Sequence, residues 1–246
     1  MHEVVPEKWI ARLRKAVGAT RLIEVETLGV FLLLAMMLFA FAQIADAVNE
    51  GDTRTFDQAV MFAMRSDADP GDPVGPEWFE EAVRDVTSLG SATVLVLVSV
   101  IVIGFLLMSG AQGAAMLVSV SVFGGMLLLR LLKEFFQRAR PDLVPHAVQV
   151  FTNSFPSGHA ALSAVTYLTL GALLARVERP RAARMYFLGV AISLTMLVGT
   201  SRVYLGVHWP TDVLAGWCVG AAWAMACWFV AARLQRRGQV ERQIDN

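Results

Sequence analysis

The chain of 246 residues is too apolar for an ordinary soluble domain of this length. Hydrophobic residues make up 56% of it and charged residues only 17%, and the mean hydropathy is +0.54. The formal net charge is zero, which excludes a strongly basic protein that binds nucleic acid. We therefore expect a membrane protein that segregates its charges along the chain.

Long uncharged segments predict the membrane spans. They lie between Glu26 and Asp46, between Asp85 and Arg130, between His159 and Arg176, between Arg184 and Arg202, and between Asp212 and Arg233. A spanning helix needs about 20 apolar residues, so the second segment is too long for one crossing, and "SGAQG" at 109–113 divides it. The expected fold is all-α, a polytopic bundle of six transmembrane helices.

The first apolar segment has a second interpretation. "AFAQ" at 40–43 resembles the small-residue cleavage site of a secretory signal. A retained anchor is favoured because a basic region of about 26 residues precedes the segment and five further spans follow it.

Basic residues orient the bundle, because cytoplasmic flanks of membrane proteins carry the excess of lysine and arginine. The cytoplasmic set is Lys8, Arg12, Arg14, Lys15, Arg21, Arg176, Arg179, Arg181, Arg184, Arg233, Arg236, Arg237 and Arg242. Residues 46–87 carry eleven acidic residues and form the predicted extracytoplasmic loop. The whole chain, 1–246, then forms one membrane-embedded domain with a cytoplasmic amino-terminal segment, 1–26, and a cytoplasmic tail, 233–246.

The predicted outer loop contains a helix of its own. "PEWFEEAVRDV" begins at Pro76 and places apolar side chains at helical spacing. We expect an amphipathic helix lying along the membrane interface. A role in admitting substrate is the alternative.

Several basic residues at 130–140 lie near the outer face, against the orientation rule. Four polar side chains recur there at steps of three and four and form one stripe of a predicted helix that Pro141 ends: Arg130, Lys133, Gln137 and Arg140. A cation facing lipid at a helix centre costs about 3 kcal/mol, so these groups must meet water, one another or an anion. For Arg130 and Arg138, snorkelling to the interface is an equally good explanation.

Two further segments add candidate site residues. "NSFPSGHA" at 153–160 places Ser157, Gly158 and His159 at the start of a helix, where free N–H groups favour a bound phosphate. "SRVYLGVHWPTD" at 201–212 places His208 four residues before Asp212. An aspartate beside Nδ1 leaves Nε2 as the reactive nitrogen, so His208 is a candidate nucleophile.

Each of these features also has a purely structural explanation. Ser157 can be an ordinary N-cap, His208 and Trp209 can anchor the protein at the interface, and Asp212 can cap the last helix. That explanation leaves the joint arrangement of the three segments to chance. Convergence of cations, two imidazoles and a helix terminus is typical of a phosphoryl-transfer site.

In combination, the three segments closely resemble the type-2 phosphatidic acid phosphatase superfamily. Its signature is K-x6-R-P, P-S-G-H and S-R-x5-H-x3-D, which correspond here to "KEFFQRARP" at 133–141, "PSGH" at 156–159 and "SRVYLGVHWPTD" at 201–212. The resemblance covers residues from about 90 to 230, with the catalytic motif region at 133–212. The first hundred residues match it only as one extra span and an outer loop.

The resemblance implies a role for each motif residue. His208 attacks phosphorus to form a phosphohistidine, Asp212 orients it, and His159 protonates the leaving oxygen. The phosphate oxygens are bound by Lys133, Arg140, Ser157, Gly158 and Arg202. The implied activity is hydrolysis of a lipid phosphate or diphosphate, of the undecaprenyl diphosphate, phosphatidylglycerophosphate, phosphatidate or lipid A type, at the outer face of a bacterial inner membrane.

We expect no cofactor, because the motif region contains no acidic cluster suited to magnesium and Glu134 has the spacing of a charge partner. Three other classes stay open. They are a lipid phosphotransferase using the same intermediate, a vanadium haloperoxidase, disfavoured because those sharing this resemblance are soluble, and a transporter or lipid-binding scaffold with charges in a cavity. The expected partners are a lipid phosphate and membrane lipids, with the oligomeric state open.

The last span contains two cysteines and a small-residue motif. Cys218 and Cys227 are nine positions apart, so on one helix they point to opposite sides and do not bridge. "GWCVG" at 216–220 has the small-xxx-small spacing of close helix contacts. We expect it to pack within the bundle, with dimerisation as the alternative.

Overall fold

The computed structural model describes residues 7–66, 69, 71–141 and 153–236, and within these ranges the regular secondary structure is entirely helical. The helices are α1 (Glu7–Glu50), α2 (Arg54–Phe62), α3 (Glu77–Ser88), α4 (Ala92–Met108), α5 (Gln112–Phe136), α6 (Gly158–Val177), α7 (Arg181–Tyr204) and α8 (Pro210–Arg236). The expected all-α fold is confirmed.

Five helices are long and apolar enough to cross a membrane. They are the Leu28–Glu50 part of α1 together with α5, α6, α7 and the Pro210–Leu234 part of α8. The helix α4 has 17 residues and spans about 25 Å at 1.5 Å per residue, slightly less than a bilayer core of about 30 Å. It joins α3 at a bend of 48°, and the described helices give six spans by length and composition if this bent pair is counted as one.

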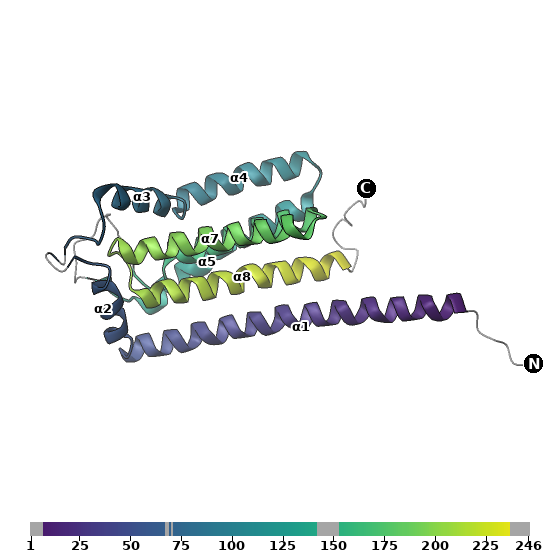
Figure 1. Cartoon of the computed structure of the whole chain (residues 1–246), viewed down its shortest axis with the longest axis horizontal. Coiled ribbons are helices and arrows are strands. Elements are labelled where there is room, and N and C mark those ends of the chain that lie inside the picture. The colour runs from purple at the N-terminus through teal and green to yellow at the C-terminus, as the bar shows by residue number, and fades with distance from the viewer. Residues whose placement is uncertain (1–6, 67–68, 70, 142–152, 237–246) are drawn as a thin grey trace, which may run out of the picture.

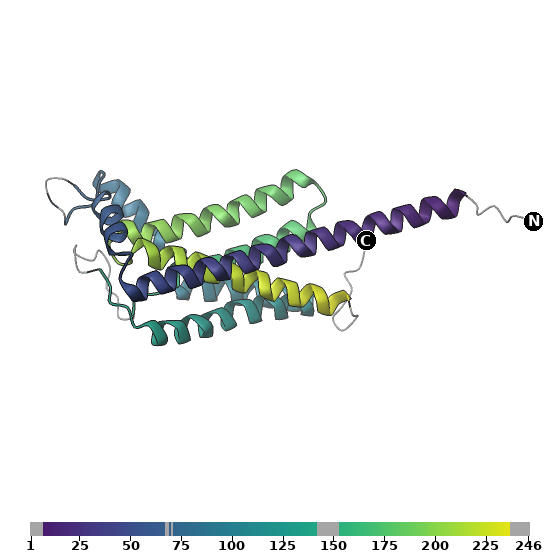
Figure 2. The same cartoon turned by 90° about the horizontal axis from the view of Figure 1, so that it is seen from below.

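The connectivity gathers the three motifs at one end of the bundle. The long helices run nearly side by side, and α2 and α3 lie at one end while the start of α1 and the end of α8 lie toward the other (Figures 1 and 2). Because α5 and α7 end where α6 and α8 begin, residues 133–141, 156–159 and 201–212 all reach the end that carries α2 and α3. The basic connection between α6 and α7 is at the opposite end, as the charge distribution predicts.

The loop between the first two spans is more ordered than the sequence indicates. The helix α1 continues to Glu50, beyond the predicted boundary at Asp46, and a second helix, α2, precedes the predicted α3. Met61 of α2 is fully buried against Ala160, Val203 and Val213, which belong to α6, α7 and α8. This tertiary packing stabilises a helix of nine residues that is too short to be stable by itself.

Small residues let α6 and α8 approach closely in the core. A methyl group added at Gly216 would lie 2.8 Å from the carbonyl oxygen of Ser157, and one at Gly220 would lie 2.4 Å from that of Ala161. The "GWCVG" motif therefore packs inside the bundle, as expected. Cys218 and Cys227, on the same helix, are free thiols.

Replacing Gly220 tests this contact. We expect Gly220→Ala to destabilise the protein by about 1–3 kcal/mol, because the backbone of α6 cannot move aside as a flexible side chain can. Thermal melting in detergent measures the effect. Gly104→Ala is the matched control, since nothing lies within 4 Å of its added methyl group, and equal melting temperatures for the two variants would contradict the packing.

Candidate active site

The basic segment after α5 is not helical, which corrects the predicted helical stripe. Gln137 has a left-handed conformation with φ of 47°, and its N–H donates to the carbonyl oxygen of Lys133. The helix therefore ends at Phe136, four residues before Arg140 and not at Pro141. From this segment Arg138 contacts Thr211 and Asp212 in the first turn of α8, and Arg140 contacts Val207 and His208 just before that helix.

The start of α6 presents a helix amino terminus to Lys133. Ser157 is the N-cap of this helix, and its side-chain oxygen accepts from the N–H of Ala160. The methyl group of an alanine in place of Gly158 would lie 3.6 Å from Cε of Lys133. The Nζ of Lys133 donates to the carbonyl oxygen of Asn153 at 2.5 Å, so this cation lies beside the N-terminal turn.

Arg202 comes from the last turn of α7 and is only 3% exposed. Its Nη1 donates to Oγ1 of Thr87 in α3 at 2.9 Å, whereas its Nε is buried without a hydrogen-bond acceptor among the described residues. A buried guanidinium donor in that condition costs free energy unless a ligand accepts from it. An anion such as phosphate fits this requirement.

His208 and Asp212 form the pair that the sequence predicts. The Nδ1 of His208 lies 3.2 Å from Oδ2 of Asp212, and both side chains are buried. On the other side of the ring, Nη1 of Arg140 lies 3.1 Å from Nε2 of His208 and donates to the carbonyl oxygen of Val207 at 2.6 Å. Because arginine can only donate, Nε2 carries the lone pair and Nδ1 carries the proton that Asp212 accepts.

Burial and charge keep His208 neutral. Desolvation is the largest cause, opposed by Asp212 and reinforced by the cations of Arg140 and Lys133, and together these effects hold the pKa of His208 well below its usual value. Burial also lowers the pKa of the Arg140 guanidinium. A neutral imidazole with its Nε2 lone pair toward the cations is the form that a nucleophile requires.

His159 lies within the electrostatic reach of the other motif residues. The cations of Arg202, Arg140 and Lys133 all lie close enough to act on its imidazole. The junction of α3 and α4 approaches the same ring, because a methyl group added at Gly90 would lie 3.3 Å from Cδ2 of His159. The structure thus brings the predicted residues from three motifs into one cluster at the end of the bundle.

Apart from His208, the residues that hold the Asp212 carboxylate were not predicted from the sequence. Arg138, for which snorkelling was an equal alternative, is 15% exposed and makes ion pairs with Asp57 and Asp212. Ser154 donates to Asp212 as well, at 2.5 Å. The Arg138 position within K-x6-R-P gave a weak signal, but Asp57 gave none, because it lies 81 residues from Arg138 in an acidic loop.

Two other predicted charges behave as ordinary surface groups. Arg130 pairs with Glu134 at 3.0 Å, as expected for a charge partner, and their side chains are 78% and 61% exposed. Exposed pairs of this kind contribute little to stability.

Comparison with known proteins agrees with this arrangement. The family model described as the PAP2 superfamily matches residues 114–236. Phosphatidylglycerophosphatase B of Bacillus subtilis is 34% identical over 194 residues, which cover 76% of this chain and 88% of that protein. A lipid A 1-phosphatase of Rhizobium etli is 28% identical over 203 residues, covering 73% of this chain and 83% of the relative.

A solved structure extends the likeness to three dimensions. The crystal structure of a transmembrane PAP2-type phosphatidylglycerolphosphate phosphatase from Bacillus subtilis superposes with a TM-score of 0.73 at 26% identity, covering 86% of this chain and 98% of that one. The region that the family model matches, residues 114–236, contains all three motifs that meet at the end of the bundle. With its several apolar helices, this multi-pass membrane protein belongs to the PAP2 superfamily of phosphatases.

Proposed function

We propose that this protein hydrolyses a lipid phosphate ester or anhydride through a phosphohistidine, at the extracytoplasmic face of a bacterial cytoplasmic membrane. The observation that carries the proposal is the setting of His208, whose Nε2 lies 3.1 Å from Nη1 of Arg140 while its Nδ1 lies 3.2 Å from Oδ2 of Asp212. Basic residues at the opposite end of the bundle support the orientation.

Binding and transfer follow from the charges around the cluster. Lys133, Arg140 and Arg202, with the N–H groups at the start of α6, bind the phosphate oxygens and stabilise the negative charge that spreads over them during transfer. When the substrate binds, Nη1 of Arg140 donates to a phosphate oxygen in place of Nε2 of His208. The Nε2 lone pair of His208 then bonds to phosphorus as the bond from phosphorus to the lipid oxygen breaks.

His159 supplies and recovers one proton. It gives the proton to the departing oxygen, so that an ester releases the lipid alcohol and an anhydride releases the lipid monophosphate, and it then takes a proton from the water that attacks the phosphohistidine. The second step releases inorganic phosphate and restores neutral His208. Asp212 stabilises the imidazolium form of the phosphorylated ring through its contact with Nδ1.

Substitution of His159 tests its role through the leaving group. We expect His159→Asn to lower the rate of phosphate release from a lipid phosphomonoester by about 10²–10⁴-fold, the range for loss of a general acid. Phosphoryl transfer from an aryl phosphate to His208 should be much less affected, because that leaving group needs no proton. Hydrolysis of the phosphohistidine still needs His159, so phosphoenzyme should accumulate. Rapid-quench kinetics measures the two steps, and an equal loss for both substrates would contradict the assignment.

The substrate is tested with purified enzyme in detergent micelles and no added metal. The panel contains phosphatidylglycerophosphate, undecaprenyl diphosphate and lipid A, because relatives named for such substrates match this chain, and phosphatidate, which the family resemblance adds. We expect phosphate release from at least one, and phosphatidylglycerophosphate is the first choice because a relative covered over 88% of its length is named for it. Transfer to an added lipid alcohol instead of water would indicate a phosphotransferase, and no turnover of any substrate would overturn the proposal.

A further inference from the structure

Arg138 connects the predicted catalytic pair to a second buried carboxylate. Its Nη1 donates to Oδ1 of Asp212 at 2.6 Å, and its Nη2 donates to Oδ2 of Asp57 at 2.8 Å. Both carboxylates are fully buried. The guanidinium also lies over the ring of Trp209, whose centroid is 5.5 Å from its central carbon.

Asp57 also holds the first turn of α8. The N–H of Thr211 donates to its Oδ1 at 3.0 Å, and the hydroxyl of Thr211 donates to its Oδ2 at 2.8 Å. A carboxylate at this position accepts from a free N–H of the helix, and its negative charge interacts favourably with the positive amino-terminal end of the helix dipole. Asp57 of α2 therefore fixes both the guanidinium and the helix that carries Asp212.

We propose that Asp57 and Arg138 are positioning residues for the proposed reaction. Arg138 occupies Oδ1 of Asp212, which leaves Oδ2 to receive the Nδ1 proton of His208 together with the N–H of Trp209 and the hydroxyl of Ser154. The alternating charges keep Asp212 ionised in a buried site. They also prevent its carboxylate from rotating away from the imidazole.

Loss of a positioning residue should affect turnover and not substrate binding. We expect Asp57→Asn and Arg138→Met each to lower kcat by on the order of 10²-fold, the cost of misplacing a reacting group by about 1 Å, with KM changed less than about twofold. Arg138→Lys should not restore kcat, because one ammonium lacks the planar fork that bridges two carboxylates. Asp52→Asn is the matched control, since that acid is exposed just before α2, and it should leave kcat unchanged.

The double variant distinguishes positioning from general destabilisation. In Asp57→Asn/Arg138→Met, we expect a kcat equal to that of either single variant, because both substitutions break one connected unit. Additive losses, a raised KM, or kcat losses that follow the melting temperature in detergent would overturn the inference. A test of phosphohistidine formation in the wild type is independent of these outcomes, so failure of the proposed chemistry is recognised separately.

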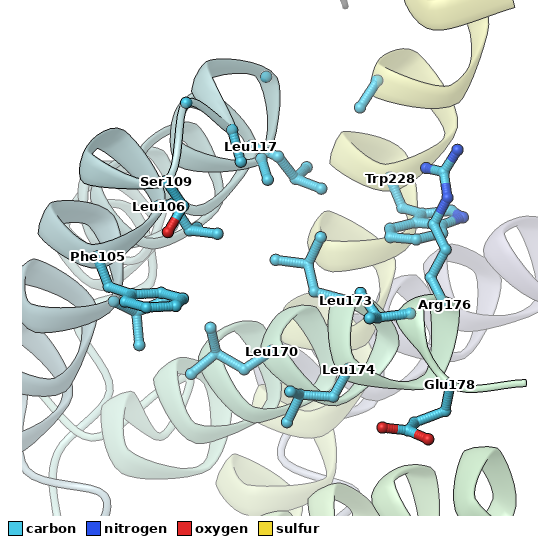
Figure 3. A pocket seen from close by; sticks show the side chains of 17 residues that line it. Phe105, Leu106, Ser109, Leu117, Leu170, Leu173, Leu174, Arg176, Glu178 and Trp228 are labelled. Atoms are coloured by element: carbon cyan, nitrogen blue, oxygen red, sulfur yellow. The ribbon is translucent and has the colours of Figure 1, made fainter. Parts of the chain in front are cut away.

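A cavity at the other end of the bundle leads to a second, independent inference. It has a volume of about 810 Å³, within the usual range for ligand sites, and lies between α4, α5, α6 and α8. Figure 3 shows Phe105, Leu117, Leu170 and Leu173 pointing into it, with Arg176 at one edge. Leu173 is 14 residues after His159, so about 21 Å of helix α6 separates the cavity from the cluster.

The chemistry of the cavity suits one kind of occupant. Its lining is mainly aliphatic and aromatic, so water has few partners in it. At the rim, the guanidinium carbon of Arg176 lies 5.5 Å from the ring centroid of Trp228. The structure records no ion pair for Arg176 with any described carboxylate, and Figure 3 shows the carboxylate of Glu178 directed away from it.

We infer that this cavity binds an anionic phospholipid from the leaflet opposite the proposed active site. An acyl chain fills the apolar space between α4 and α6, and the lipid phosphate pairs with Arg176 at the end of α6, which is where basic side chains meet lipid headgroups. Since α4 is a short span that bends away at α3, a lipid at this position also supports it against the bundle.

Photocrosslinking in nanodiscs tests the inference. The probe is phosphatidylglycerol with a diazirine in the middle of one acyl chain, and mass spectrometry of peptides locates the products. We expect Phe105, Leu170 and Leu173 to be labelled several-fold more than Ile192 and Met196, which are exposed on α7. Leu173→Trp, which fills the cavity, should remove the excess.

A second variant tests the headgroup contact. Arg176→Gln should abolish a preference for the phosphatidylglycerol probe over the same probe built on phosphatidylcholine, while some chain labelling persists. If the cavity residues were labelled no more than Ile192 and Met196 of α7, only ordinary boundary lipid would be present, and the inference would be overturned. Competition by a substrate lipid that loses its effect in Lys133→Ala would assign the cavity to the substrate's own tail and would also overturn it.

Discussion

Replacement of His208 by asparagine is expected to lower phosphate release by at least about 10⁴-fold, the order found when an enzymatic nucleophile is removed. Asparagine keeps a polar side chain near Asp212 but offers no basic nitrogen to phosphorus. The cations proposed to bind phosphate stay in place, so substrate should still bind. The measurement is lipid phosphate hydrolysis by purified protein, together with trapping of phosphoenzyme from a labelled substrate.

The trapping arm makes the result specific to the proposed intermediate. Wild-type protein should yield a phosphorylated peptide that contains His208 and is labile in acid but stable in base, whereas His208→Asn should yield none. An unchanged melting temperature in detergent controls for folding. Retention of full activity, or phosphorylation of another residue in the wild type, would rule out the nucleophile assignment.

Replacement of Asp212 by asparagine is expected to lower kcat by about 10⁴-fold through the tautomer of His208. The amide can turn its NH₂ group toward Nδ1, which then has to accept, and the proton moves to Nε2, where the lone pair is needed. The carboxylate also stabilises the imidazolium of the phosphorylated ring. Both effects act on turnover, so KM should change little.

The partners of Asp212 provide the control for this variant. Ser154→Ala removes one hydrogen bond to Oδ2 but leaves the charge, the contact with Arg138 and the contact with His208. We expect Ser154→Ala to lower kcat by less than about tenfold, the loss of one hydrogen bond of about 1 kcal/mol. If Ser154→Ala lowered kcat as much as Asp212→Asn, both losses would be explained by a loss of local structure and not by a change in the charge of Asp212 or the tautomer of His208.

The spans and the meeting of the three motifs can be predicted from the sequence because each has a local signature. An uncharged segment of about 20 residues identifies a transmembrane helix wherever it occurs. Likewise, the three motifs lie at helix ends that an antiparallel arrangement must bring together. The spacing of His208 and Asp212 therefore sufficed to predict their contact, which the structure places at 3.2 Å.

Other features depend on contacts that no local pattern encodes. A continuous helical period through 130–140 predicted one stripe, but the left-handed conformation of Gln137 ends the helix and leaves Arg138 and Arg140 on a non-helical segment. Helix α2 depends on the burial of Met61 against three distant helices. Asp57 is chemically one acid among eleven in its loop, and only the fold selects it.

The placement of the whole cluster at one rim of the bundle has a consequence for lipid traffic. A headgroup reaching His208 from the near leaflet never crosses the hydrocarbon layer, and the dephosphorylated alcohol returns to the leaflet from which the ester came. In the proposed orientation, a lipid phosphate made on the cytoplasmic side must be translocated by another protein before hydrolysis. Turnover in cells then depends on that flipping step as well as on the chemistry at phosphorus.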